Sequence, residues 1–286
     1  MSQFKSYLSL IKFSHTIFAM PFAMIGFFLG IATTESSFDW FLLLLIILCM
    51  IFARSAAMAF NRYVDRDIDG SNPRTAKVRE IPNGTIKAQS ALVFVIINCF
   101  LFISCTWFIN PLCFLLSPIA LIIILGYSYT KRFTALCHLI LGLGLSLAPL
   151  GAFLAVTAEF AITPILFSIA VLFWVGGFDI IYSLQDKAFD KNQNLHSIPV
   201  WTGKKQALQL AKVFHFVTFF ALLYPAINQN FESFYWIGFS IFSALLIYQH
   251  SIVKHNDLSK VNLAFFTTNG VASVVFSIFV ILELSL

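Results

Sequence analysis

Charged residues are scarce in this sequence. Only 11% of its 286 residues are Asp, Glu, Lys or Arg, whereas 59% are hydrophobic, and the mean hydropathy is +0.87. A soluble domain carries roughly 25% charged residues, so the composition excludes a soluble domain with a polar exterior. The five cysteines show no CxxC spacing, which argues against a disulfide framework. The net charge of +5 comes from short loops between apolar runs, so nucleic acid is not a predicted partner.

Long apolar runs fill most of the chain. A helix that crosses a bilayer needs about 20 mostly apolar residues. Nine runs meet this requirement, and they predict an all-α, polytopic membrane protein with a single domain over residues 1–286. The predicted spans are 14–33, 39–60, 88–109, 111–130, 136–156, 163–184, 207–228, 233–252 and 263–284.

The few charges are distributed unevenly between the loops. Lys5 and Lys12 precede the first predicted span, and other Lys and Arg residues follow the second, fourth, sixth and eighth. The positive-inside rule therefore predicts a cytoplasmic N-terminus. Acidic clusters follow spans two and six, which suggests two four-helix half-repeats plus a ninth helix. The remaining loops and the end of the ninth span carry only acidic charges, at Glu35, Asp39, Glu159, Glu232 and Glu283.

The first acidic cluster, NRYVDRDID, occupies residues 61–69. Asn61, Asp65 and Asp69 are spaced four residues apart, which places them on one face of a helix. Hard cations such as Mg²⁺ prefer oxygen ligands and bridge carboxylates to phosphates. A solvated helix end with Asp–Arg pairs to Arg62 and Arg66 would give the same pattern, so this cluster alone leaves both readings open.

The second acidic cluster follows the sixth predicted span. Asp179, Tyr182, Asp186 and Asp190 are spaced by three, four and four residues and also share a helical face. Asp179 lies near the end of the apolar run, where an ionisable group is a functional candidate. Two aligned acidic faces at matching places in the chain favour a divalent-metal site that holds a diphosphate over two solvated helix ends.

Basic and phenolic groups accompany the acids. Tyr127 and Lys131 are four residues apart, and both side chains can donate to phosphate oxygens. Arg74 and Arg79 either meet the same diphosphate or serve as topological anchors. Arg54 lies inside an apolar run and needs a partner, either a substrate carboxylate or an aspartate. The histidines in or beside the spans show no metal-ligand spacing; they are His15, His138 and His215.

The first cluster resembles a motif of the UbiA family of intramembrane prenyltransferases, and the resemblance extends from the first predicted span to the ninth. The family pattern is Asn-Asp-x-x-Asp-x-x-x-Asp, and Asn61, Asp65 and Asp69 match it. Arg79 lies in the segment that corresponds to the basic loop of the family. One position departs from the pattern, because Arg62 stands where the family has an aspartate.

The second cluster strengthens the resemblance. The family has Asp-x-x-x-Asp with a tyrosine four residues earlier, and Tyr182, Asp186 and Asp190 match it. The Tyr-x-x-x-Lys of the fourth family helix corresponds to Tyr127 and Lys131. The stretch 177–200 looks most like bacterial 4-hydroxybenzoate polyprenyltransferases and their menaquinone-pathway relatives.

This resemblance implies Mg²⁺-dependent transfer of a polyprenyl group from polyprenyl diphosphate to an aromatic acid, 4-hydroxybenzoate or a related acceptor, in ubiquinone or menaquinone biosynthesis. It implies a lipid-embedded enzyme of the bacterial inner membrane, with its active site facing the cytoplasm and no obligate protein partner. Naphthoate, homogentisate, haem-precursor and chlorophyll-precursor acceptors remain alternatives, as does a transporter. The expected metal ligands and catalytic residues are Asp65, Asp69, Asp186 and Asp190, with Lys131 as a further catalytic residue. The expected substrate contacts are Asn61, Arg62, Arg54, Arg79, Tyr127, Tyr182 and Asp179.

Overall fold

The structure, a computed structural model, describes residues 3–11 and 18–286, with side chains from Ser6 onward. Within these ranges the chain is helical and has no β-strand, apart from an isolated bridge between Lys254 and Asp257. The expected all-α fold is therefore confirmed for the described residues. The charge of Lys12 and the ring of His15, both considered above, lie outside the described residues.

Nine predicted spans have helical counterparts in the described part of the chain. These are α2 (Met20–Thr34), α3 (Trp40–Val64), α5 (Ala88–Ile109), α6 (Pro111–Thr130), α7 (Cys137–Thr157), α8 (Ile162–Ser183), α11 (Lys204–Asn228), α12 (Ser233–Ile252) and α13 (Asn269–Ser285), the last preceded by the π-helical turn η2 (Leu263–Thr268). Four short helices join them: α1 (Gln3–Leu10), α4 (Arg66–Ser71), α9 (Lys187–Asn192) and α10 (Ile198–Thr202).

Seven of the described helices are long and apolar enough to cross a membrane. They are α3, α5, α6, α7, α8, α11 and the continuous η2–α13 segment. The apolar helix α2 is shorter, with 15 residues, and α12 is not among the seven. The count of nine spans and the cytoplasmic N-terminus therefore stay predictions.

Polar side chains cap the first turn of two long helices, α3 and α6. Asp39 caps α3, because its carboxylate accepts from the backbone N–H groups of Phe41 and Leu42 at 2.8 and 3.2 Å. Asn110 caps α6 by accepting from Cys113 N at 2.8 Å, and Pro111 occupies the first helical position. The Asn–Pro pair thus forms the predicted turn between α5 and α6.

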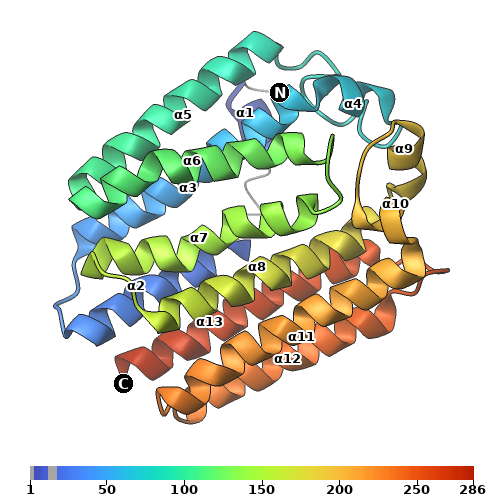
Figure 1. Cartoon of the computed structure of the whole chain (residues 1–286). Helices are drawn as coiled ribbons and strands as arrows, with labels where there is room; N and C mark the ends of the chain where they lie inside the picture. Colours follow the sequence, from blue (N-terminus) through green and yellow to red (C-terminus); the bar gives the residue numbers. More distant parts are fainter. Residues whose placement is uncertain (1–2, 12–17) are drawn as a thin grey trace.

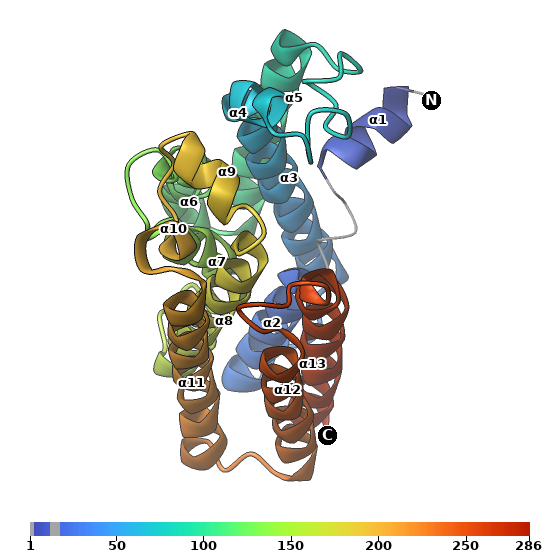
Figure 2. The ribbon, with the colours of Figure 1, turned by 90° about the vertical axis from the view of Figure 1, so that its right-hand side faces the viewer.

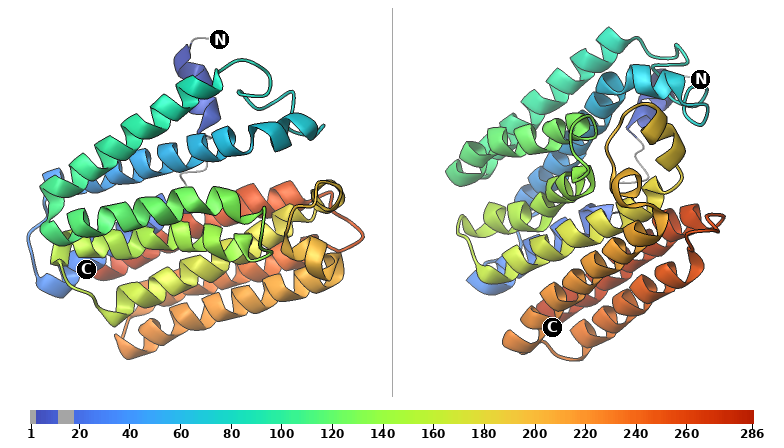
Figure 3. Two further views of the ribbon diagram at one scale, coloured as in Figure 1. Left: turned by 45° about the horizontal axis from the view of Figure 1, so that its top comes forward. Right: turned by 45° about the vertical axis from the view of Figure 1, so that its right-hand side comes forward.

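The long helices run side by side, and their ends form two opposite faces of the molecule (Figure 1). The short helices α4, α9 and α10 gather at one end with the loops after α6 and α12, whereas Leu286 lies at the opposite end. Figure 2 looks toward the end that carries α4 and α9, and Figure 3 shows that α2, α7 and α8 lie between the α3–α5–α6 group and the α11–α12–α13 group. Both acidic clusters therefore reach the same end of the bundle.

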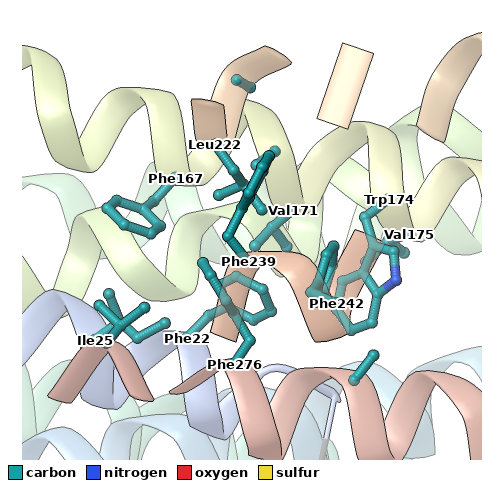
Figure 4. Close-up of a cluster of buried hydrophobic side chains, with 14 of the residues drawn as sticks. Phe22, Ile25, Phe167, Val171, Trp174, Val175, Leu222, Phe239, Phe242 and Phe276 are labelled. Carbon is teal, nitrogen blue, oxygen red and sulfur yellow. The ribbon is translucent and has the colours of Figure 1, made fainter. Parts of the chain in front are cut away.

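A core of aromatic side chains joins α2 and α8 to the last helices (Figure 4). The ring centroids of Phe22 and Trp174 are 5.4 Å apart, those of Trp174 and Phe242 5.7 Å, and those of Phe242 and Phe276 5.2 Å. Trp174 also donates its indole N–H to Asn269 Oδ1 at 3.0 Å, which satisfies a buried polar group. This packing fixes the position of α8, which carries Asp179 and Tyr182.

Two glycines allow α7 to approach its neighbours closely. A Cβ atom at Gly142 would lie 2.2 Å from the carbonyl oxygen of Leu172 on α8. A Cβ atom at Gly26 on α2 would lie 2.0 Å from the carbonyl oxygen of Pro149. Only glycine fits at these crossings, as is typical of packed membrane helices.

Candidate active site

Each acidic cluster lies where a long helix breaks and a short one follows. The helix α3 ends at Val64 and α4 begins at Arg66, and the same arrangement recurs between α8 and α9. The sequence predicted continuous helical faces, and this detail is wrong. At the first break, Arg132 donates to the carbonyl oxygen of Val64 at 2.9 Å, so a side chain rather than the next helical turn satisfies that carbonyl. The two breaks resemble each other, while the two four-helix half-repeats stay a prediction.

The first cluster is held by arginines from two loops. Asp65 accepts from Arg132 at 2.9 Å and from the amide of Asn61 at 3.0 Å. Asp69, only 5% exposed, forms an ion pair with Arg79. A backbone bond of 2.7 Å from Asp69 N to Asp65 O keeps the two carboxylates on neighbouring turns. The structure thus brings Asn61, Asp65, Asp69 and Arg79 together, and their roles stay predictions.

The second cluster is held by bases from the loops after α4 and α6. Arg74 Nη2 lies 2.5 Å from Asp186 Oδ2, and its Nη1 donates to the hydroxyl of Tyr182 at 3.3 Å. Lys131 Nζ lies 2.7 Å from Oδ1 of Asp190, a fully buried carboxylate. Arg74 therefore links the loop of the first cluster to the acids of the second, a contact that crosses 112 positions in the sequence.

Burial governs the electrostatics of these acids. Burial raises the pKa of Asp65 above its usual range, although Arg132 opposes the shift. Burial likewise raises the pKa of Asp190, against the effect of Lys131. Burial lowers the pKa of Lys131, but the nearby carboxylates of Asp190 and Asp186 have the larger combined effect, so its pKa is raised. The carboxylates are thus incompletely compensated by their bases, and an additional cation would stabilise their ionised forms.

Asp179 has a partner that the sequence did not indicate. Its Oδ2 lies 2.7 Å from Nδ1 of His138, which is 2% exposed, and Nε2 of the same ring accepts from Ile198 N at 3.3 Å. Because Nε2 accepts a hydrogen bond, we assign the ring proton to Nδ1, which donates it to Asp179. His138 thereby ties α8 to α7 and α10. A role of Asp179 in substrate contact stays a prediction.

The donor chemistry of the two clusters fits a hard divalent cation. Carboxylate oxygens are the ligands that Mg²⁺ prefers. Asp65 interacts electrostatically with Asp69, and Asp186 with Asp190, so each cluster presents a pair of acids. In the described part of the chain, no three His, Cys, Asp or Glu side chains are close enough to hold a metal ion together. The carboxylates are instead distributed among separate ion pairs.

An apolar cavity of about 350 Å³ lies between α3, α5, α6 and α7. Arg54 and Tyr127 line it near the end that carries the acids, and Ile109 and Cys113 line it near the opposite end. The lining residues of α6 extend from Cys113 to Tyr127, which corresponds to about 21 Å along the helix. Tyr127 also interacts electrostatically with Asp65. The elongated apolar cavity thus has one end near the first acidic cluster.

Comparison with known proteins identifies the family. The sequence model of the UbiA prenyltransferase family matches residues 19–271. The chain is 28% identical over 232 residues to the 4-hydroxybenzoate octaprenyltransferase of Francisella tularensis subsp. mediasiatica, and the aligned region covers 81% of each chain. It is 29% identical over 238 residues to the enzyme of the same name from Tolumonas auensis, which covers 83% of this chain and 82% of the relative.

Solved structures agree with this match. The apo structure of a UbiA homologue from Aeropyrum pernix K1 superposes with a TM-score of 0.80 at 27% identity, over 94% of this chain and 96% of the homologue. A UbiA homologue from Archaeoglobus fulgidus, bound to GPP and Mg²⁺, superposes with a TM-score of 0.74 at 22% identity, over 98% and 100% of the two chains. That identity supports the fold alone. The family match and the apolar helices together establish an integral membrane protein that belongs to the UbiA prenyltransferase family.

Proposed function

We propose that the chain transfers a polyprenyl group from polyprenyl diphosphate to the ring of an aromatic acid, 4-hydroxybenzoate or a related acceptor, in quinone biosynthesis. The observation that carries this proposal is the arrangement of two aspartate clusters, each held by ion pairs with basic side chains. Both lie at the end of the bundle where Arg54 and Tyr127 line an elongated apolar cavity. The names of the curated relatives support the acceptor and the pathway. The Archaeoglobus homologue, bound to GPP and Mg²⁺, supports the donor and the metal.

In this proposal the metal is held by Asp65, Asp69, Asp186 and Asp190. When bound, Mg²⁺ supplies charge neutralisation of the diphosphate leaving group. With the carboxylates engaged in holding a metal, the bases that pair with them in this structure would be available to a phosphate ligand. Lysine and arginine bind phosphate oxygens well, so each of these bases can contact the departing diphosphate. The bases in question are Lys131, Arg74, Arg79 and Arg132.

The cavity accounts for the rest of the reaction. Its apolar walls fit an isoprenoid tail and exclude water from the allylic carbon as the C–O bond breaks and its electron pair leaves with the diphosphate. A ring carbon ortho to the acceptor hydroxyl then forms the new C–C bond and loses its proton. Arg54 lines the cavity, and its Nε has no partner among the described residues, so we assign it to the carboxylate of the acceptor.

The membrane placement belongs to the same proposal. We propose a single domain over residues 1–286 with nine spans in the bacterial inner membrane. The loops that carry Lys and Arg lie at the same end as α4 and α9, and Glu35, Asp39, Glu159 and Glu232 lie in loops at the other end. This asymmetry supports a cytoplasmic N-terminus and an active site that faces the cytoplasm.

Prenyl transfer in membranes that contain the chain tests the proposal. 4-Hydroxybenzoate and a polyprenyl diphosphate are supplied with Mg²⁺ or with EDTA, and products are identified by mass spectrometry. We expect a prenylated acid that forms only with Mg²⁺ and is absent from membranes with Asp65→Ala or Asp186→Ala. A product from naphthoate or homogentisate instead would change the acceptor and the pathway. Absence of product with every acceptor, from folded protein, would contradict the proposed reaction.

A further inference from the structure

Arg62 is a buried cation that forms no ion pair with another described residue. It is 6% exposed and stands at the position where the family pattern has an aspartate. Its Nη1 donates to Asn61 Oδ1 at 2.9 Å, whereas its Nε has no partner among the described residues. A buried guanidinium is strongly unfavourable unless negative charge lies nearby. The structure should therefore contain a compensating acid close to Arg62.

Glu80 has the properties expected of that acid. It is 5% exposed, its Oε1 accepts from the hydroxyl of Ser9 on α1, and its Oε2 has no partner in the described part of the chain. The segments that carry the two residues pack together, because Leu10 of α1, Ala59 of α3 and Ile86 of the loop share one apolar cluster, against which Ile81 also packs. Arg62 is repelled by Arg79 and attracted by Asp69 and, more weakly, by Glu80. Two cations, the buried Arg62 and the half-buried Arg79, are thus balanced by two buried carboxylates. An aspartate at position 62 would leave three acids against one base.

Arg62 also determines which hydrogen bonds the side chain of Asn61 makes. Because Asn61 Oδ1 accepts from Arg62, its amide nitrogen is directed to Asp65, where it donates to Oδ2 at 3.0 Å. The other oxygen of Asp65 accepts from Arg132. With Arg62 in place, the side-chain oxygen of Asn61 is occupied, and Asn61 acts as a support for Asp65.

We propose that Arg62 and Glu80 are a matched pair of positioning residues for the first acidic cluster. Arg62 orients Asn61 and thereby Asp65, while Glu80 balances the charge of Arg62 and, through Ser9, fastens the loop after α4 to α1. The activity readout of this inference rests on the proposed function. A direct contact between Arg62 and the substrate diphosphate is the competing explanation, in which Glu80 would have no special relation to Arg62.

A double-mutant cycle separates the two explanations. Arg62→Met leaves Glu80 as an uncompensated buried acid, and Glu80→Gln leaves Arg62 as an uncompensated buried cation. We expect each to lower prenyl transfer by about 30-fold or more and to raise the half-saturating Mg²⁺ concentration, because removal of one member of a buried charge pair is strongly unfavourable. We expect Arg62→Met/Glu80→Gln to be at least about tenfold more active than the product of the two single effects predicts.

A matched control uses Lys77, an exposed base in the same loop. Lys77→Met combined with Glu80→Gln should give effects that multiply, since these side chains do not share a buried site. Thermal unfolding in detergent supplies a readout that does not require substrate, and the double variant should melt above both single variants. The inference would be overturned if the effects of Arg62→Met and Glu80→Gln on activity multiply in the double variant and their losses in melting temperature add. The melting temperatures decide this whether or not the wild-type chain prenylates 4-hydroxybenzoate.

Discussion

Replacement of Lys131 by methionine should show how much one basic side chain of the site contributes to the unfolding free energy and to turnover. Lys131 Nζ lies 2.7 Å from Asp190 Oδ1, whose side chain is 0% exposed, while the lysine side chain is 35% exposed. At an effective dielectric constant of 20, the pair attracts by about 6 kcal/mol before desolvation is counted. Removal of one partner from a buried pair costs about 3–5 kcal/mol. Because Lys131 is partly solvated, we expect the lower value, about 3 kcal/mol of unfolding free energy.

The companion variant Lys131→Met/Asp190→Asn distinguishes stability from catalysis. A neutral amide at position 190 no longer needs a cation, so the double variant should regain most of the lost stability. Its prenyl transfer should stay at least about 100-fold below wild type, since the loss of one charge-stabilising group costs 10²–10³ in turnover. Unfolding in detergent and Mg²⁺-dependent turnover in liposomes measure the two effects. Lys131→Arg is the control, because it keeps the charge.

Two outcomes would refute this reasoning. A double variant as unstable as Lys131→Met would show that the contact with Asp190 contributes little to folding. A double variant with wild-type turnover would show that neither side chain belongs to the diphosphate site.

Three further predictions concern other parts of the site. Arg74→Gln should raise the KM for polyprenyl diphosphate about tenfold, because a phosphate-binding cation is lost. It should change the unfolding free energy by less than about 1 kcal/mol, because the arginine side chain is 38% exposed. Steady-state kinetics measure the first effect and unfolding in detergent measures the second. His138→Ala should lower the unfolding free energy by about 1–3 kcal/mol, since Asp179 and a buried backbone N–H lose their partner; wild-type stability would refute this. Gly151→Phe should reduce transfer from long donors more than from short ones, because Gly151 lines the cavity and a Cβ there meets no atom within 4 Å. Gly126→Phe, on the same helix bundle but outside the cavity lining, should leave the length preference unchanged.

The long helices could be predicted from sequence because each is a mostly apolar run with polar residues near its ends. Asn110 and Pro111 marked the turn between α5 and α6, and the structure confirms it. The acidic clusters were also visible, since spacings of four residues survive a local helix break. Asp69 N still bonds to Asp65 O across the break after α3.

The pairing of charges could not be predicted in the same way. Arg74 contacts Asp186 across 112 positions, and His138 contacts Asp179 across 41. Such contacts depend on how α7, α8 and the loops pack, and no local spacing encodes that packing. Arg132 lies beside Lys131 in a basic loop, and nothing in its spacing predicts that it holds Asp65 and the end of α3.

Most of the cavity wall and the ion pairs occupy different stretches of the chain. Residues in the middle of α3, α5, α6 and α7 line the apolar space, whereas the ion pairs lie on α4, α9 and the segments that follow α3 and α6. Substitutions along α5 and α6 can therefore alter the length of the space without altering the charge balance at its end. The length of the prenyl chain can in this way change by substitution of a few residues in the cavity wall, while the charged groups at its end stay the same.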